Sequence, residues 1–174
     1  FTSTTPGAPM AKNWYSNTIS NYGTITIESG TIENACTSGS ACYALDNYEG
    51  STATINGGKL TSRSTTVRVF NWGSKKTTLN ITDGTITSEV GYAINTNTGN
   101  TSNIELNISG GTISTNDTNY NLAVYVYANG SAKDTVVNIS GGTFDGYVAF
   151  GEVASDTMIE GNVSISGGSM DDVI

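Results

Sequence analysis

The stretch Leu106-Asn-Ile-Ser-Gly-Gly-Thr-Ile113 decides the fold, because five other segments of the chain align with it without a gap. These segments begin at Ile25, Ala53, Leu79, Val137 and Val163. An anchoring glycine recurs at positions 30, 58, 84, 111, 142 and 168, which gives separations of 28, 26, 27, 31 and 26 residues. Self-similarity at such a period is typical of solenoid proteins, in which each repeat is one structural unit.

Each repeat predicts three short strands. Apolar residues alternate with Thr, Asn or Ser before the glycine, which is the pattern of a strand with one buried face. The Gly or Gly-Gly that follows permits a bend where a side chain would clash or φ must be positive. A second strand then begins, for example at Thr112-Ile113, and a third apolar run follows a variable polar loop, for example from Leu122 to Tyr127.

A unit of this length cannot bury its own apolar face, but coils stacked about 4.8 Å apart would bury all such faces in one column. The sequence therefore predicts an all-β fold, a single-stranded right-handed parallel β-helix with three short strands per coil. Residues 21–174 would form one domain of about five to six coils, and residues 1–20 would cap the first coil, with Trp14 and Tyr15 packed on it.

Three ladders of stacked side chains are expected to fill the core. The middle ladder is isoleucine in every repeat, because identical β-branched side chains stack well on a pleated surface. Its members are Ile27, Ile55, Ile81, Ile108, Ile139 and Ile165. The two other ladders are Ile25, Ala53, Leu79, Leu106, Val137 and Val163, and Ile32, Leu60, Ile86, Ile113, Phe144 and Met170.

The charge balance excludes several classes of function. The 174 residues contain 7 Lys and Arg, 15 Asp and Glu and no His, which gives a net charge of −8. Without His there is no His-based catalytic triad and no imidazole metal ligand. The largest basic cluster is Lys75-Lys76, so we expect no nucleic-acid partner and no binding to an anionic membrane surface. No run approaches the ~18 apolar residues of a membrane span, and we expect no cofactor.

The two cysteines predict a local disulfide. Cys36 and Cys42 are separated by a short Ser- and Gly-containing loop, a spacing that suits a disulfide and does not match a CxxC redox or zinc motif. Two free thiols are the alternative. A disulfide would indicate an oxidising, extracellular setting.

Tandem coils of the form x-Ile-Ser-Gly-Gly-Thr-Ile, as in residues 107–113, resemble the β-helical repeats of surface and carbohydrate-binding proteins of anaerobic gut bacteria and of some phage fibres. The resemblance covers about residues 21–174. It implies an extracellular or cell-surface module of a larger multidomain protein, with a role in adhesion, and starch-adherence proteins are one possibility. The shared motif is scaffold, so it indicates the fold more strongly than the function.

The third strands carry the candidate binding residues. If Val67, Val69, Val124 and Val126 point inward, the side chains between them point outward. The strand between these two coils would present Ala93 and Asn95, which leaves a shallow dip between aromatic walls. Asn47-Tyr48 and Asn71-Trp72 occupy comparable positions, so Tyr48 and Trp72 are expected to be neighbours. The candidate site comprises Tyr48, Arg68, Phe70, Asn71, Trp72, Asn95, Tyr125 and Tyr127.

Exposed rings beside Asn and Arg are the chemistry of a sugar site, because C–H faces lie on the ring while polar groups bind the hydroxyls. The sequence therefore predicts a non-catalytic polysaccharide-binding module, with starch or another α-glucan as a possible ligand. Alternatively, loops cover these rings or the rings form a subunit contact. Tyr43, Tyr92 and Tyr147, which open their strands, are expected to be core or corner residues.

Other functions remain open at this point. A structural spacer, an adhesin or a phage-fibre segment would use the same scaffold. A polysaccharide-degrading enzyme would need converging carboxylates, and the repeat aligns only Asp145 and Asp171, which could also bind calcium. The outward Thr, Asn and Ser residues of the first strands could order water as in ice binding, but a solvated polar face is the simpler interpretation. We expect no catalysis.

Overall fold

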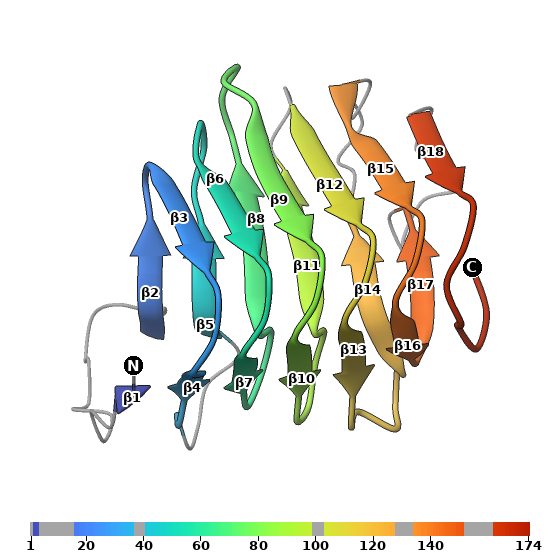
Figure 1. Ribbon diagram of the computed structural model, residues 1–174, viewed down its shortest axis with the longest axis horizontal. Coiled ribbons are helices and arrows are strands. Elements are labelled where there is room, and N and C mark those ends of the chain that lie inside the picture. Colours follow the sequence, from blue (N-terminus) through green and yellow to red (C-terminus); the bar gives the residue numbers. More distant parts are fainter. Residues whose placement is uncertain (1, 4–15, 37–40, 99–102, 128–133, 152–161) are drawn as a thin grey trace.

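The computed structural model is a β-solenoid of about five turns with three parallel sheets and three strands per coil (Figure 1). It describes residues 2–3, 16–36, 41–98, 103–127, 134–151 and 162–174. The predicted all-β parallel solenoid is thereby confirmed. In each turn the chain passes through one strand of each sheet, and the turns advance as a right-handed coil (Figure 1). This hand agrees with the strong preference for right-handed connections between parallel strands.

Each sheet contains one strand from every coil. Sheet C, built from the first strands of the repeats, comprises β3 (Thr24–Ile27), β6 (Thr52–Ile55), β9 (Thr77–Ile81), β12 (Ile104–Ile108), β15 (Val136–Ile139) and β18 (Asn162–Ile165). Sheet A comprises β1 (Thr2–Ser3), β4 (Thr31–Asn34), β7 (Lys59–Ser62), β10 (Thr85–Ser88), β13 (Thr112–Thr115) and β16 (Thr143–Asp145). Sheet B comprises β2 (Ser16–Asn21), β5 (Cys42–Asn47), β8 (Val67–Asn71), β11 (Ile94–Thr98), β14 (Leu122–Val126) and β17 (Tyr147–Phe150).

The core is the predicted column of stacked aliphatic side chains. Consecutive isoleucines of the middle ladder are direct partners from Ile27 to Ile165. The ladder from Ile32 to Phe144 is equally regular, and Met170 packs against the core after it. Inner members such as Ile81 and Ile108 are 1% exposed, whereas Ile165 in the last coil is 39% exposed. Stacking therefore buries each coil between its two neighbours.

The two glycines of the Gly-Gly motif are required for different reasons. A Cβ on Gly110 would lie 2.1 Å from the carbonyl oxygen of Thr82 in the preceding coil, so a side chain there would collide with backbone. Gly111 has a φ of +85°, which L-residues with a side chain rarely adopt. The first glycine permits close stacking of the coils, and the second permits the turn into sheet A.

Sheet B begins earlier in the sequence than the repeat indicated. β2 pairs in parallel with β5, with Ser16 opposite Cys42 and Asn21 opposite Asn47. Residues 16–20 were predicted to belong to a cap outside the repeat, but the structure places them in the sheet. β2 lacks the Gly-Gly motif and has one aliphatic residue, Ile19, so the search for repeats did not detect it.

Two further predictions concern the first coil. Cys36 and Cys42 form the predicted disulfide, with their Cα atoms 6.3 Å apart. The predicted packing of Trp14 and Tyr15 lies outside the described residues. Within the described ranges, no helix is long and apolar enough to cross a lipid bilayer.

Candidate functional site

The outer face of sheet B presents two rows of side chains in the register of the strands. Inward residues such as Val67, Ile94 and Val124 are direct partners in the core. One outward row consists of Ser20, Asp46, Arg68, Asn95, Tyr125 and Ala149. The other outward row begins with aromatic residues, which follow directly after the partners Asn21 and Asn47.

Four rings form a continuous line on this face, which we call the aromatic row: Tyr22, Tyr48, Phe70 and Trp72. The rings of Tyr22 and Tyr48 are nearly parallel, with their centroids 4.3 Å apart. The Tyr48 ring meets the Phe70 ring edge-on, with a centroid distance of 5.7 Å. The Phe70 and Trp72 rings are stacked at 5.8 Å. Tyr22 and Trp72, at the two ends, are 71% and 65% exposed. The row therefore offers open ring surface at both ends.

A buried ion pair supports the aromatic row. Arg68 donates Nε–H to Oδ1 of Asp46 at 2.8 Å and a second bond from Nη2 to Oδ2 at 2.5 Å. Asp46 is completely buried, and its Oδ2 also accepts a hydrogen bond from Asn17 at 2.8 Å. The Arg68 guanidinium carbon lies 4.3 Å from the Tyr43 ring centroid and 4.8 Å from that of Phe70. These contacts fix the guanidinium by two charge-assisted bonds and by cation–π attraction.

The same pair changes two pKa values. Burial alone would lower the pKa of Arg68, but the hydrogen bonds and the charge of Asp46 outweigh it and raise the pKa. Burial raises the pKa of the Tyr48 hydroxyl well above its ordinary value, and the nearby Asp46 carboxylate adds to the shift by a hydrogen bond and by repulsion of a phenolate. Both groups therefore keep their protons at neutral pH, Arg68 as a cation and Tyr48 as a neutral donor.

A second aromatic cluster lies two strands further along sheet B. The Tyr125 ring centroid is 5.0 Å from that of Tyr92 and 6.0 Å from that of Tyr127, and the three rings pack with Leu122 and Ala149. Between this second aromatic cluster and the aromatic row lies Asn95, the direct partner of both Arg68 and Tyr125. Its Nδ2 donates to the carbonyl oxygen of Tyr125 at 3.3 Å.

The structure therefore brings the predicted residues to one face but exposes them unequally. Trp72 is exposed, and Tyr48, Phe70, Asn95 and Tyr127 are half-buried. Arg68 and Tyr125 are buried, so they position other groups more than they meet a ligand.

Asn71 was predicted to bind sugar, but the structure turns its side chain away from solvent. Its side chain is fully buried and donates to the carbonyl oxygens of Lys75 and Asn103, both at 2.7 Å. Asn47 likewise donates to the carbonyl oxygen of Thr78 in the next coil at 2.9 Å. These asparagines join successive coils at a corner, because a side-chain amide can replace a backbone donor there.

Two other details differ from the sequence prediction. Tyr48 contacts Phe70 and not Trp72, because the pairing of Asn47 with Val69 places Phe70 opposite Tyr48. Ala93 does not face outward but is completely buried in the core at a corner. Tyr43 is buried and Tyr92 lies at a corner, as expected; the Tyr43 ring packs against Arg68, and Tyr92 and Tyr147 pack against the second aromatic cluster.

Sequence reasoning also missed two exposed rings. Tyr22 completes the aromatic row, and the paired dipeptides Asn21-Tyr22 and Asn47-Tyr48 were the signal that could have found it. Tyr120 lies at a hollow described below, and no repeat pattern marks it.

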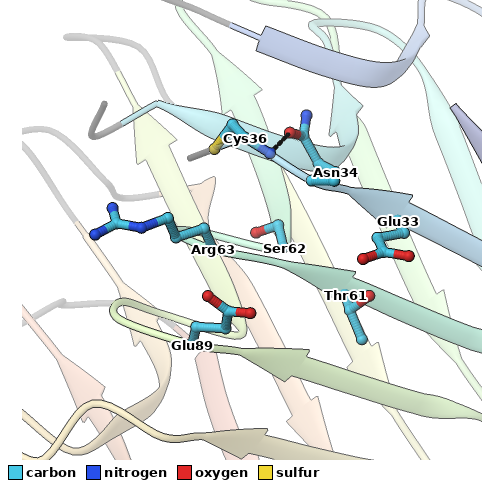
Figure 2. A pocket seen from close by; sticks show the side chains of 8 residues that line it. Glu33, Asn34, Cys36, Thr61, Ser62, Arg63 and Glu89 are labelled. Carbon is cyan, nitrogen blue, oxygen red and sulfur yellow. Dashed lines mark hydrogen bonds between the residues drawn. The ribbon is translucent and has the colours of Figure 1, made fainter. Parts of the chain in front are cut away.

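Two hollows line the corner where sheet A turns into sheet B. Figure 2 shows the first, the acidic hollow, in which Glu33 and Thr61 lie side by side and Arg63 extends away from Glu33; Glu89 is also part of its lining. The second, the corner hollow, has a volume of about 370 Å³ and is lined by Arg63, Thr65, Val90, Tyr92, Asp117 and Tyr120, among others. Burial, followed by the proximity of Tyr120 and Asp117, raises the pKa of Tyr92.

Of the two carboxylates that the repeat aligns, Asp171 binds the backbone of the preceding coil. Oδ2 of Asp171 accepts a hydrogen bond from the backbone N–H of Gly146 at 3.1 Å, and Asp145 is exposed. No group of three or more Asp, Glu, Cys or His that could hold a metal ion occurs in the part of the chain that the structure describes.

No protein-family model, no curated protein and no solved structure matches this chain. The chain has the stacked three-strand coils of a β-solenoid, while the predicted relation to gut-bacterial surface proteins stays a prediction.

Proposed function

We propose that the protein is a non-catalytic carbohydrate-binding module that holds a polysaccharide on the outer face of sheet B. The observation that carries this proposal is the aromatic row, whose two end rings, Tyr22 and Trp72, are exposed. Rings of this kind bind the C–H faces of a pyranose, and exposed aromatic surface on a soluble fold indicates an interaction site.

The polar surroundings of the row suit a neutral polyhydroxyl ligand. The Arg68 cation is neutralised by Asp46, so the pair adds no net charge to the face. The Tyr48 hydroxyl and the Asn95 amide lie along the same face and can exchange hydrogen bonds with hydroxyl groups. A planar amide and a phenol beside open rings favour sugars over anions or cations.

Binding of a single short sugar is expected to be weak, because an open face buries little of its ligand. A long polysaccharide can contact both the aromatic row and the second aromatic cluster. Several such modules on one multidomain surface protein would raise the avidity further. The Cys36–Cys42 disulfide supports an oxidising, extracellular or cell-surface location. A starch-type α-glucan is the first ligand to test.

The test is affinity electrophoresis in gels that contain amylopectin, pectin, xylan or galactomannan. We expect at least one of these polysaccharides to retard the wild type. Trp72→Ala is expected to weaken that binding about tenfold, because the loss of one ring contact costs up to about 1.5 kcal/mol. Trp72→Phe keeps a ring and should retain most of the binding. Thr26→Ala, on the exposed face of sheet C, is the matched control and should bind as the wild type does.

Three results would contradict the proposal. The first is a wild type that none of the four gels retards. The second is a stable oligomer whose dissociation follows Trp72→Ala, measured by light scattering, because the rings would then form a subunit contact in a spacer or fibre. Product release that Asp145→Asn or Asp171→Asn abolishes would instead indicate an enzyme.

A further inference from the structure

The corner hollow is built by three successive coils. Arg63 and Thr65 come from the connection between β7 and β8, Val90 and Tyr92 from that between β10 and β11, and Asp117 and Tyr120 from that between β13 and β14. A ligand in this hollow would therefore contact loops that lie far apart in the sequence. The stacking of the coils alone brings these loops together.

The lining of the hollow is aromatic and open. Tyr120 is 65% exposed and Val90 is 49% exposed. Tyr92 is half-buried, and its ring packs on Tyr125 of the second aromatic cluster at 5.0 Å. The hollow is therefore continuous with the outer face of sheet B through Tyr92. Its volume of about 370 Å³ lies at the lower end of the range for ligand sites.

Hydrogen bonds hold the walls of the hollow in place. Thr115 Oγ1 donates to the carbonyl oxygen of Gly91 at 2.6 Å, and the N–H of Val90 donates to the carbonyl oxygen of Arg63 at 2.8 Å. The loop that carries Tyr120 is closed by a bond from the N–H of Asn121 to the carbonyl oxygen of Asp117 at 2.9 Å. A site with fixed walls loses little conformational entropy when a ligand binds.

The hollow is lined by one charged side chain of each sign, Asp117 and Arg63. Oδ1 of Asp117 accepts the N–H of Asn119 at 2.8 Å, which leaves Oδ2 without a hydrogen-bond partner among the described residues. Arg63 forms no ion pair within the described part of the chain. One carboxylate and one guanidinium beside two phenol rings favour a neutral ligand with hydroxyl groups, because an anion or a cation would meet one repulsive charge.

We propose that the corner hollow is a second sugar subsite, which takes one pyranose unit from an end or a side branch of the polysaccharide held on sheet B. Tyr120 is the stacking platform, and Asp117 and Arg63 bind hydroxyl groups. This inference rests on the proposed function, because Tyr92 connects the hollow to the same face.

The test uses the polysaccharide that retards the wild type most strongly among amylopectin, pectin, xylan and galactomannan. Its dissociation constant is measured for wild type, Tyr120→Ala, Tyr120→Phe and Trp72→Ala. We expect Tyr120→Ala to weaken binding about fivefold to tenfold and Tyr120→Phe to weaken it less than twofold. Asp117→Asn is expected to weaken binding about threefold. Circular dichroism melting checks that each variant is folded.

The outcomes separate the two proposals. If Trp72→Ala weakens binding and folded Tyr120→Ala does not, the subsite is wrong and the proposed function stands. If Tyr120→Ala weakens binding and Trp72→Ala does not, the hollow binds sugar and the aromatic row does not. If the wild type binds none of the four polysaccharides, both proposals are wrong.

Discussion

The outer faces of sheets B and C belong to the same stacked coils, yet their side chains differ in what they contact. On sheet C the side chains bond to one another: Asn107 Nδ2 donates to Asn80 Oδ1 at 2.9 Å, and Asn138 Nδ2 donates to Asn107 Oδ1 at 2.8 Å. On sheet B the aromatic row covers a buried ion pair and keeps open ring surface. A self-bonded ladder of this kind stabilises the stack, whereas open ring surface can contact a ligand.

The largest expected effect lies on sheet B. Arg68→Met should destabilise the protein by about 3–5 kcal/mol, because it leaves the Asp46 carboxylate buried without its cationic partner. Denaturant unfolding followed by circular dichroism measures this loss. The double variant Asp46→Asn/Arg68→Met should recover part of the stability, since no buried charge remains. A loss below about 1 kcal/mol for Arg68→Met would show that the pair is not the support of the aromatic row.

A smaller effect is expected on sheet C. Asn107→Ala removes the hydrogen bonds to Asn80 and from Asn138 and should cost about 1–2 kcal/mol of unfolding free energy, with no change in polysaccharide affinity. Asn138→Ala is the matched control. The Asn138 amide makes one such side-chain hydrogen bond among the described residues, so this variant should lose less unfolding free energy. If Asn107→Ala weakens polysaccharide binding while the protein stays folded, the assignment of binding to sheet B and of stabilisation to sheet C is wrong.

The smallest effect concerns the exposed pair on sheet C between Lys76 Nζ and Glu105 Oε2, which are 2.8 Å apart. The hydrogen bond from Lys76, with a further one from Asn107, lowers the pKa of Glu105 below its ordinary value. The pair therefore adds stability above about pH 4.5, and this stability is lost as the pH falls through the lowered pKa. Since both groups are partly exposed, Glu105→Gln should cost only a few tenths of a kcal/mol at pH 7 and less at pH 2.5. Unfolding curves at the two pH values measure the difference, and an equal cost at both would contradict it.

The face that carries the candidate site could be predicted from the sequence, but the exposure of each side chain on it could not. The period-two pattern around Val67 and Val69 placed Arg68, Phe70 and Trp72 near one outer face, and that placement is confirmed. Whether each outward side chain reaches solvent depends on its neighbours in other coils. Arg68 is covered because Asp46 lies directly beside it, and Asn71 is covered because the next coil offers a carbonyl oxygen.

The amino-acid sequence alone was enough to predict the solenoid, the three strands of each coil and the isoleucine ladder, because coils of this length bury a repeated apolar face by stacking. It also determined the disulfide, since the two cysteines lie in one short loop. Three features arise only when the chain is folded: the pairing of Asp46 with Arg68, the line of rings from Tyr22 to Trp72 and the hollow between Tyr92 and Tyr120. These depend on the relative offset of neighbouring coils, which loops of unequal length set and the repeat motif does not encode.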